Sequence, residues 1–128
     1  MTRCLPRAEV RPTQLYLSSE KLAGVLEWFE FDEPEYEPLP AFEHGGEWYL
    51  ADGHTRAFAA SLAGADAIRV ERDPSVRETY DFEVYRRCIE WCRDAGVETV
   101  DDLHGRVVGP RAYRELWVER CQRVGDDG

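Results

Sequence analysis

The sequence predicts an α+β fold, in which a small mixed sheet carries packed helices, and three observations support this prediction. Residues 48–73 have the pattern of an apolar strand, a polar turn, an Ala-rich helix and a second strand. Apolar residues recur at helical spacing over 19–30, and two further helical patterns occupy the last third of the chain. A chain of 128 residues with 43% hydrophobic residues suits one domain, 1–128, with its own core.

Local signals define the elements at the start of the chain. A short edge element is expected over 7–10, and Pro12 ends it because proline has no backbone N–H to donate. An amphipathic helix is expected over 19–30, since Ser18 and Ser19 are favoured cap residues. The core-facing side of this helix consists of apolar residues at helical spacing: Leu22, Val25, Leu26 and Phe29.

An acidic segment separates this helix from the sheet. Residues 27–37 carry six acidic side chains, which predicts a solvated loop, with a mobile flap over a neighbouring site as the alternative. Residues 39–43 and 47–51 then flank His44-Gly45-Gly46. This arrangement predicts a hairpin with a Gly-containing turn.

The Ala-rich segment is expected to form a helix over 54–63, because Ala has the highest helix propensity. Gly64 is the expected left-handed residue after this helix, and a strand over 67–71 follows. Asp52 is interpreted either as the N-cap of the helix, where Asp is favoured, or as a member of a site. The two roles do not exclude each other.

The C-terminal extension, residues 75–125, is expected to be helical and to pack on the core. It carries helical stripes over 82–95 and 110–124, and Pro110 suits the first turn of the second one. One shared core is expected from two helical stripes and two strands: Leu22, Leu26, Phe29, Leu50, Phe58, Leu62, Ile68 and Val70.

The four cysteines do not form a metal-binding pattern. Cys88 and Cys92 lie one helical turn apart, on or beside the apolar side of their helix. Metal sites usually have closer clusters such as Cys-x-x-Cys, together with further ligands. Both thiols are therefore expected to be reduced and buried, and no structural metal is expected.

The charge of the chain limits its partners. There are 26 acidic and 16 basic side chains, a net charge of −10, and Lys21 is the single lysine. Such a protein disfavours nucleic acid, because each phosphate contact needs a cation. No apolar run has the length of a membrane span, and the N-terminus lacks the apolar core of a signal peptide. We expect a cytoplasmic protein with no membrane partner.

Four polar or small residues stand at the start of the central helix: Gly53, His54, Thr55 and Arg56. Backbone N–H groups in a first helical turn have no partners, and the helix dipole favours anions there. Gly53 allows a ligand to approach the backbone closely. This pattern predicts a phosphate site. The alternatives are that His54 is structural and that Arg56 pairs with one of the many carboxylates.

The same residues carry a resemblance to a known family. Asp52-Gly-His-Thr-Arg56, followed by Ala-x-Ala-Ala and Gly64, resembles the DGHxR signature of the ParB/sulfiredoxin superfamily. The segment over 11–22 resembles the beginning of the same domain, so the resemblance covers about residues 7–74. It implies that the helix start binds nucleotide phosphates. Members of the superfamily include CTP-binding partition proteins, sulfiredoxins, free serine kinases and domains labelled nucleases.

The chain departs from each of these groups. Sulfiredoxins use a Cys in a Gly-Cys-His-Arg motif, and His54 stands in its place here. The free serine kinases are nearest in motif, but they carry a Glu shortly after the Pro of the first segment. This chain has Gln14 there, which cannot accept a proton as a carboxylate does, and Glu20 is a candidate substitute. Partition proteins add a helix-turn-helix domain, which the last residues do not resemble.

Two functions from different classes are left open. The first is an enzyme that binds ATP, ADP, CTP or a phosphorylated metabolite at 53–56, with Mg²⁺ at Asp52. It would catalyse phosphoryl transfer or phosphate-ester hydrolysis on a small molecule, with Asp52 and His54 as catalytic candidates and Gln14 and Glu20 as accessory residues. His54 would donate a hydrogen bond or a proton. The second is a non-catalytic module whose C-terminal helices contact a protein partner.

Overall fold

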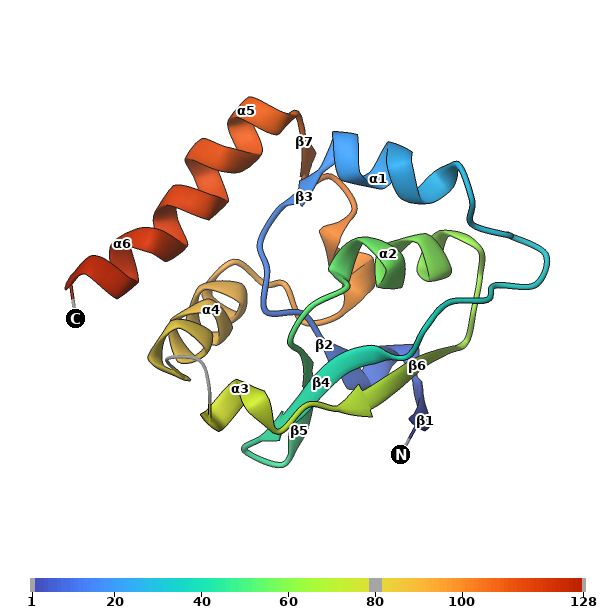
Figure 1. Cartoon of the computed structure of the whole chain (residues 1–128), viewed down its shortest axis with the longest axis horizontal. Coiled ribbons are helices and arrows are strands. Elements are labelled where there is room, and N and C mark those ends of the chain that lie inside the picture. The colour runs from blue at the N-terminus through green and yellow to red at the C-terminus, as the bar shows by residue number, and fades with distance from the viewer. Residues whose placement is uncertain (1, 79–81, 128) are drawn as a thin grey trace.

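The structure, a computed structural model, describes residues 2–78 and 82–127 and has the predicted α+β architecture (Figure 1). The main sheet is built from β1 Thr2–Pro6, β2 Val10–Arg11, β4 Leu39–His44, β5 Glu47–Leu50 and β6 Ala67–Arg72. Its five strands have the order β1-β6-β4-β5-β2. The sheet is mixed, as predicted: β1/β6 and β4/β5 are antiparallel pairs, and β4/β6 and β2/β5 are parallel pairs.

A second, very short pairing joins distant parts of the chain. β3 (Leu17–Ser18) pairs in parallel with β7 (Val107–Val108). The pairing connects the segment before the first long helix to the C-terminal third, and neither strand was predicted.

The helices lie around the sheet. The α-helices are α1 Ser19–Leu26, α2 His54–Leu62, α3 Ser75–Glu78, α4 Phe82–Asp94, α5 Pro110–Tyr113 and α6 Glu119–Asp127. Two 3₁₀ turns, η1 Arg7–Glu9 and η2 Val100–Leu103, and a π-helical turn, η3 Arg114–Val118, complete the set. Figure 1 shows α2 between the main sheet and α1, and the residues from α5 to α6 as one long helical run on the left of the view.

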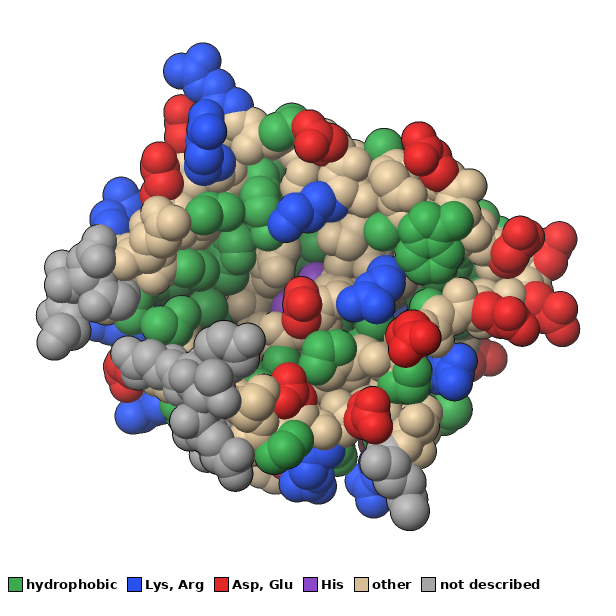
Figure 2. Space-filling view, in the orientation of Figure 1, with side chains coloured by type: hydrophobic (Ala, Val, Ile, Leu, Met, Phe, Trp, Pro, Cys, Tyr) green, Lys and Arg blue, Asp and Glu red, His purple; other side chains and the backbone are tan. Residues whose placement is uncertain are grey.

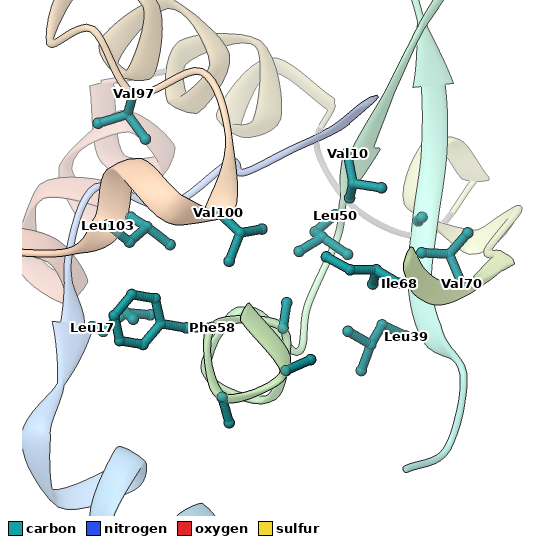
Figure 3. Packing of buried hydrophobic residues seen from close by; sticks show 14 of the residues in the cluster. Val10, Leu17, Leu39, Leu50, Phe58, Ile68, Val70, Val97, Val100 and Leu103 are labelled. Carbon is teal, nitrogen blue, oxygen red and sulfur yellow. The ribbon is translucent and has the colours of Figure 1, made fainter. Parts of the chain in front are cut away.

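The main core surrounds α2. Ala57, Ala59 and Ala60 are fully buried, and their small side chains let the helix lie close to its neighbours. Figure 3 shows Leu39, Leu50, Ile68 and Val70 on one side of this helix and Leu17, Phe58 and Leu103 on the other. The buried cluster also includes Cys88, Val97 and Trp117, so the C-terminal third contributes to the same core.

The opposite face of the sheet is covered as well. Phe42 and Tyr49 are register partners in the β4–β5 hairpin, and their rings stack at 5.7 Å between centroids. They form a second buried cluster with Val76 and Ile89, from α3 and α4. The hairpin turn contains Gly45 and Gly46, both at positive φ (60° and 81°), as the sequence predicts.

Several sequence predictions need correction. Within the edge element expected over 7–10, Arg7–Glu9 form the 3₁₀ turn η1 and Val10 begins the edge strand β2; the other edge strand, β1, was not predicted. The helix expected over 19–30 ends at Leu26. Leu26 and Leu62 were predicted in the core, but they are 37% and 49% exposed. Each is the last residue of its helix, where fewer neighbours cover a side chain. Leu22 is half-buried.

The remaining core predictions are confirmed, because Phe29, Leu50, Phe58, Ile68 and Val70 are buried. The helices predicted over 54–63 and 82–95 correspond to α2 and α4. The predicted helix over 110–124 is the run from α5 to α6, interrupted by the π-helical turn. Within the described residues, no helix is long and apolar enough to cross a membrane.

The cysteines and the acidic segment agree with their predictions in part. Cys88 and Cys92 are buried free thiols. The six acidic side chains of residues 27–37 are exposed in a segment without helix or strand. The segment is nevertheless held in place, because Phe29 and Tyr36 are buried within it and stack on each other. The Tyr36 hydroxyl also accepts the backbone N–H of Arg69 at 3.0 Å.

Candidate functional site

Helix α2 begins at a left-handed glycine and has no side-chain cap. Gly53 is the N-cap residue, with φ 80° in the left-handed region, and no side chain caps the helix. Asp52 is therefore not the N-cap that one interpretation expected. Its Oδ1 accepts the N–H of Gly53 at 2.8 Å and so stabilises the turn. Among the described residues, no side chain accepts from the N–H groups of the first helical turn.

A cavity of about 380 Å³ opens at this helix start, and we call it the α2 pocket. Its lining contains all the predicted site residues except one: Gln14, Asp52, Gly53, His54, Thr55 and Arg56. Glu20, the remaining accessory candidate, is exposed and lies outside the lining. The structure adds Lys21, Trp28 and Tyr113, which sequence reasoning missed.

The α2 pocket has a local excess of positive charge. In the part of the chain that the structure describes, Lys21 and Arg56 line it together with a single carboxylate, Asp52. Among the described residues, neither Lys21 nor Arg56 forms an ion pair, although acidic side chains outnumber basic ones 26 to 16. The ammonium of Lys21 lies 5.1 Å from the ring centroid of Tyr113. Both cations are therefore available to an anion in the pocket.

His54 is the most buried polar residue of the site, with 3% of its surface exposed. Its Nε2 accepts the backbone N–H of Thr13 at 2.9 Å. Burial lowers the pKa of His54 to about 4, so the ring is neutral near pH 7. Because Nε2 is the acceptor, the ring proton lies on Nδ1.

The second ring nitrogen has no partner. Within the described part of the chain, Nδ1 of His54 is the one buried side-chain nitrogen or oxygen that makes no hydrogen bond. Unpaired buried donors are rare because they cost free energy. A neutral ring can offer this N–H to an acceptor, whereas donating a proton as imidazolium is unfavourable. The geometry thus favours the hydrogen-bonding role expected of His54.

Gln14 connects the first segment to the C-terminal helices. Its Nε2 donates to the carbonyl of Tyr16 at 2.7 Å and to the hydroxyl of Tyr113 at 3.0 Å. Both contacts use the amide nitrogen, and the side-chain oxygen has no hydrogen bond among the described residues. Gln14 therefore positions Tyr113 at the pocket and presents an acceptor.

Two further cavities adjoin the α2 pocket. One, of about 610 Å³, shares Trp28 and Arg56 with it and is bordered by Glu35 and Glu37 of the acidic segment. The other shares Gln14 and His54 with it and lies toward the C-terminal helices. Figure 2 shows this face hollowed beside the C-terminal run, with hydrophobic side chains gathered there and acidic ones at the opposite edge.

Comparisons with known proteins concern the fold. No protein-family model matches the chain, and no curated protein matches it. Among solved structures, the chain is similar to sulfiredoxin from Arabidopsis thaliana, with 19% identity, 70% of this chain and 97% of that chain covered, and a TM-score of 0.48. It is also similar to protein Atu1540 from Agrobacterium tumefaciens, with 14% identity, 77% and 50% covered, and a TM-score of 0.44.

Proposed function

We propose that the α2 pocket binds the phosphate groups of a nucleotide or of a small phosphorylated metabolite. One observation carries the proposal: an uncapped helix start opens onto a cavity of about 380 Å³ lined by Lys21 and Arg56. Free amides and the helix dipole favour an anion there. A guanidinium can hold two phosphate oxygens at once, which adds both energy and orientation.

The neighbouring side chains have complementary roles in this proposal. Arg56 and Lys21 would neutralise phosphate charge, and the hydroxyl of Thr55 would add a hydrogen bond. A Cβ atom at Gly53 would lie 2.8 Å from Cδ2 of Leu39 and 3.0 Å from Nη2 of Arg56. Because glycine has no Cβ atom, the side chain of Arg56 and a bound ligand have room beside this position. Trp28 is 50% exposed and offers a flat ring on which a base can stack.

Asp52 would hold Mg²⁺ at the same opening. Of the described residues, it is the single carboxylate that lines the pocket. Among the described residues, no group of three or more His, Cys, Asp or Glu side chains could hold a metal ion. Mg²⁺ usually keeps several waters and binds through one or two carboxylates together with substrate phosphates. Asp52 with phosphate oxygens fits that pattern, and the bound ion would neutralise charge during phosphoryl transfer or hydrolysis.

A second candidate function is a non-catalytic module that binds the nucleotide and contacts a protein partner. Gln14 favours it, because an amide stands where the related kinases have a carboxylate base. The low pKa of His54 also makes this ring a weak base. Turnover of a bound nucleotide separates the two candidates: an enzyme releases phosphate or transfers it, and a module leaves the nucleotide intact.

Calorimetric titration tests the binding proposal. Wild-type protein is titrated with inorganic phosphate, ATP, ADP and CTP, each with and without Mg²⁺. Arg56→Ala is expected to weaken binding about 10- to 150-fold, since a lost charged hydrogen bond costs about 1.5–3 kcal/mol. Arg111→Ala is the matched control, because the Arg111 side chain is 86% exposed and lies outside the pocket. Wild-type protein that binds none of these ligands at millimolar concentration would refute the proposal.

A further inference from the structure

A second cavity of about 280 Å³ lies between α4, the C-terminal helical run and the turn before α2, and we call it the α4–α6 pocket. Its lining is mostly apolar or weakly polar: Ala51, Val84, Tyr85, Cys88, Trp117 and Cys121. Among the residues that the structure describes, no Asp, Glu, Lys or Arg side chain lines it. Transferring a charged group into such surroundings is costly, so the lining favours a neutral occupant.

The α4–α6 pocket adjoins the α2 pocket. Gln14 and His54 line both cavities. The C-terminal run also contributes to both, with Tyr113 in the α2 pocket and Trp117 in the α4–α6 pocket. A molecule in the α4–α6 pocket would therefore lie beside a phosphate group bound at the start of α2.

The helix between Tyr113 and Cys121 is distorted where it lines the cavity. Residues Arg114–Val118 form a π-helical turn, and Trp117 lies within it. Single π-helical turns are rare and occur frequently at functional sites. The distorted turn contains a residue that lines the α4–α6 pocket. It therefore supports a binding site there independently of the cavity volume.

Two polar groups at the border of the cavities lack partners. His54 carries a buried Nδ1 that makes no hydrogen bond in the described part of the chain. The side-chain oxygen of Gln14 likewise accepts none from the described residues, since both contacts of this side chain use Nε2. A hydroxyl group can accept from one N–H and donate to one carbonyl, which matches this pair.

We propose that the α4–α6 pocket binds a small neutral alcohol with an apolar or aromatic body, its hydroxyl directed toward Gln14 and His54. A cavity of about 280 Å³ suits a fragment-sized ligand. The inference rests on the proposed function, because it supplies the second molecule beside the bound phosphate. The occupancy of the two pockets can nevertheless be measured separately.

Benzyl alcohol is the probe, and benzylamine, a cation at neutral pH, is its charged comparator. Saturation-transfer NMR is expected to show benzyl alcohol binding to wild-type protein at least tenfold more tightly than benzylamine. Val84→Phe adds a ring to the pocket lining and should weaken benzyl alcohol binding at least tenfold without changing phosphate affinity. Leu116→Phe is the control, because Leu116 is 44% exposed and precedes Trp117 outside the lining.

A second measurement needs no variant. Cys121 is half-buried in the lining, and the hydrogen bond from Cys88 lowers the pKa of its thiol, so iodoacetamide should react with it. Benzyl alcohol is expected to slow alkylation of Cys121. It should leave alkylation of Cys4, an exposed thiol outside the lining, unchanged.

The outcomes separate the two proposals. The proposed alcohol site is wrong if benzyl alcohol fails to bind wild-type protein, binds no better than benzylamine, or leaves Cys121 unprotected. This holds whether or not phosphate binds. If benzyl alcohol binds and phosphate does not, the proposed function is refuted and the proposed alcohol site is supported. Arg56→Ala supports both proposals when phosphate affinity falls and benzyl alcohol affinity stays at the wild-type value.

Discussion

The backbone N–H of Thr13 donates a hydrogen bond to Nε2 of His54 at 2.9 Å, across 41 residues of sequence. The Thr13 hydroxyl also donates to the carbonyl of Leu50 at 2.7 Å. These buried contacts fix the start of α2 against the first segment of the chain. They also determine the tautomer of His54, because a nitrogen that accepts a hydrogen bond cannot carry the ring proton. The conformation of the α2 pocket therefore depends on a neutral imidazole.

Acid should destabilise the fold through His54. The unfolded ring binds a proton at its usual pKa of 6.5, whereas the folded ring does so at about 4. Its contribution to stability is complete above pH 6.5 and is lost as the pH falls toward 4. Between pH 6.5 and 5, wild-type protein should lose about 2 kcal/mol relative to His54→Gln, at about 1.36 kcal/mol per pH unit. Denaturant unfolding of both proteins tests this, and parallel pH curves would contradict it.

Gly53 should be more sensitive to substitution than Gly64. Both have φ 80°, but a Cβ atom at Gly53 would contact Leu39 and Arg56, whereas nothing lies within 4 Å of one at Gly64. Gly64→Ala should cost about 1–2 kcal/mol from the left-handed backbone alone, and Gly53→Ala should cost more. Only Gly53→Ala should weaken phosphate binding. Equal losses of stability and equal affinities in the two variants would show that the space around Gly53 is unimportant.

Asp52→Asn should distinguish the role of Asp52 in the turn from its proposed role as a Mg²⁺ ligand. An Asn Oδ1 can accept the N–H of Gly53 as the Asp52 carboxylate does, so the turn is expected to survive. Without the negative charge, inorganic phosphate should bind several-fold more tightly in the absence of Mg²⁺. The tightening of nucleotide binding by Mg²⁺ should disappear. Calorimetry in which Mg²⁺ strengthens nucleotide binding equally in both proteins would exclude Asp52 as the Mg²⁺ ligand.

Duplex DNA should bind weakly or not at all at moderate salt. The chain has a net charge of −10, and basic side chains are outnumbered. Each phosphate contact needs a cation, and the affinity falls as salt competes. Fluorescence anisotropy with a random duplex tests this expectation. Sub-micromolar, salt-sensitive binding would favour a nuclease or DNA-partition function instead.

The sequence predicted those parts of the fold that local signals determine. Gly45 and Gly46 mark the hairpin, and the Ala-rich run together with Gly64 marks α2. Strands β3 and β7 have two residues each and pair across about ninety positions, so no local sequence pattern predicts them. Leu62 fits the apolar pattern of α2 but is the last residue of the helix and is exposed. Periodicity in the sequence does not show which end residues of a helix are covered by neighbouring side chains.

The candidate site was predictable where its residues are contiguous. Gly53 to Arg56 line one cavity because a single turn presents them. Lys21 and Tyr113 reach the same cavity from α1 and α5, and only tertiary packing brings them there. Lys21 is the single lysine of the chain, which was a usable signal. Its neighbour Glu20 was chosen for its carboxylate, but it is exposed and lies outside the lining.

Amide chemical shifts test most directly whether phosphate binds against the backbone at the start of α2. ¹⁵N-labelled wild-type protein and Arg56→Ala are titrated with inorganic phosphate and followed by ¹H–¹⁵N NMR. In wild-type protein, the amides of His54, Thr55 and Arg56 should shift most and saturate together, while the amide of Ile68 in β6 should stay unchanged. In Arg56→Ala, the same shifts should require at least tenfold more phosphate. Saturable shifts centred elsewhere, or none at these three amides, would contradict the claim.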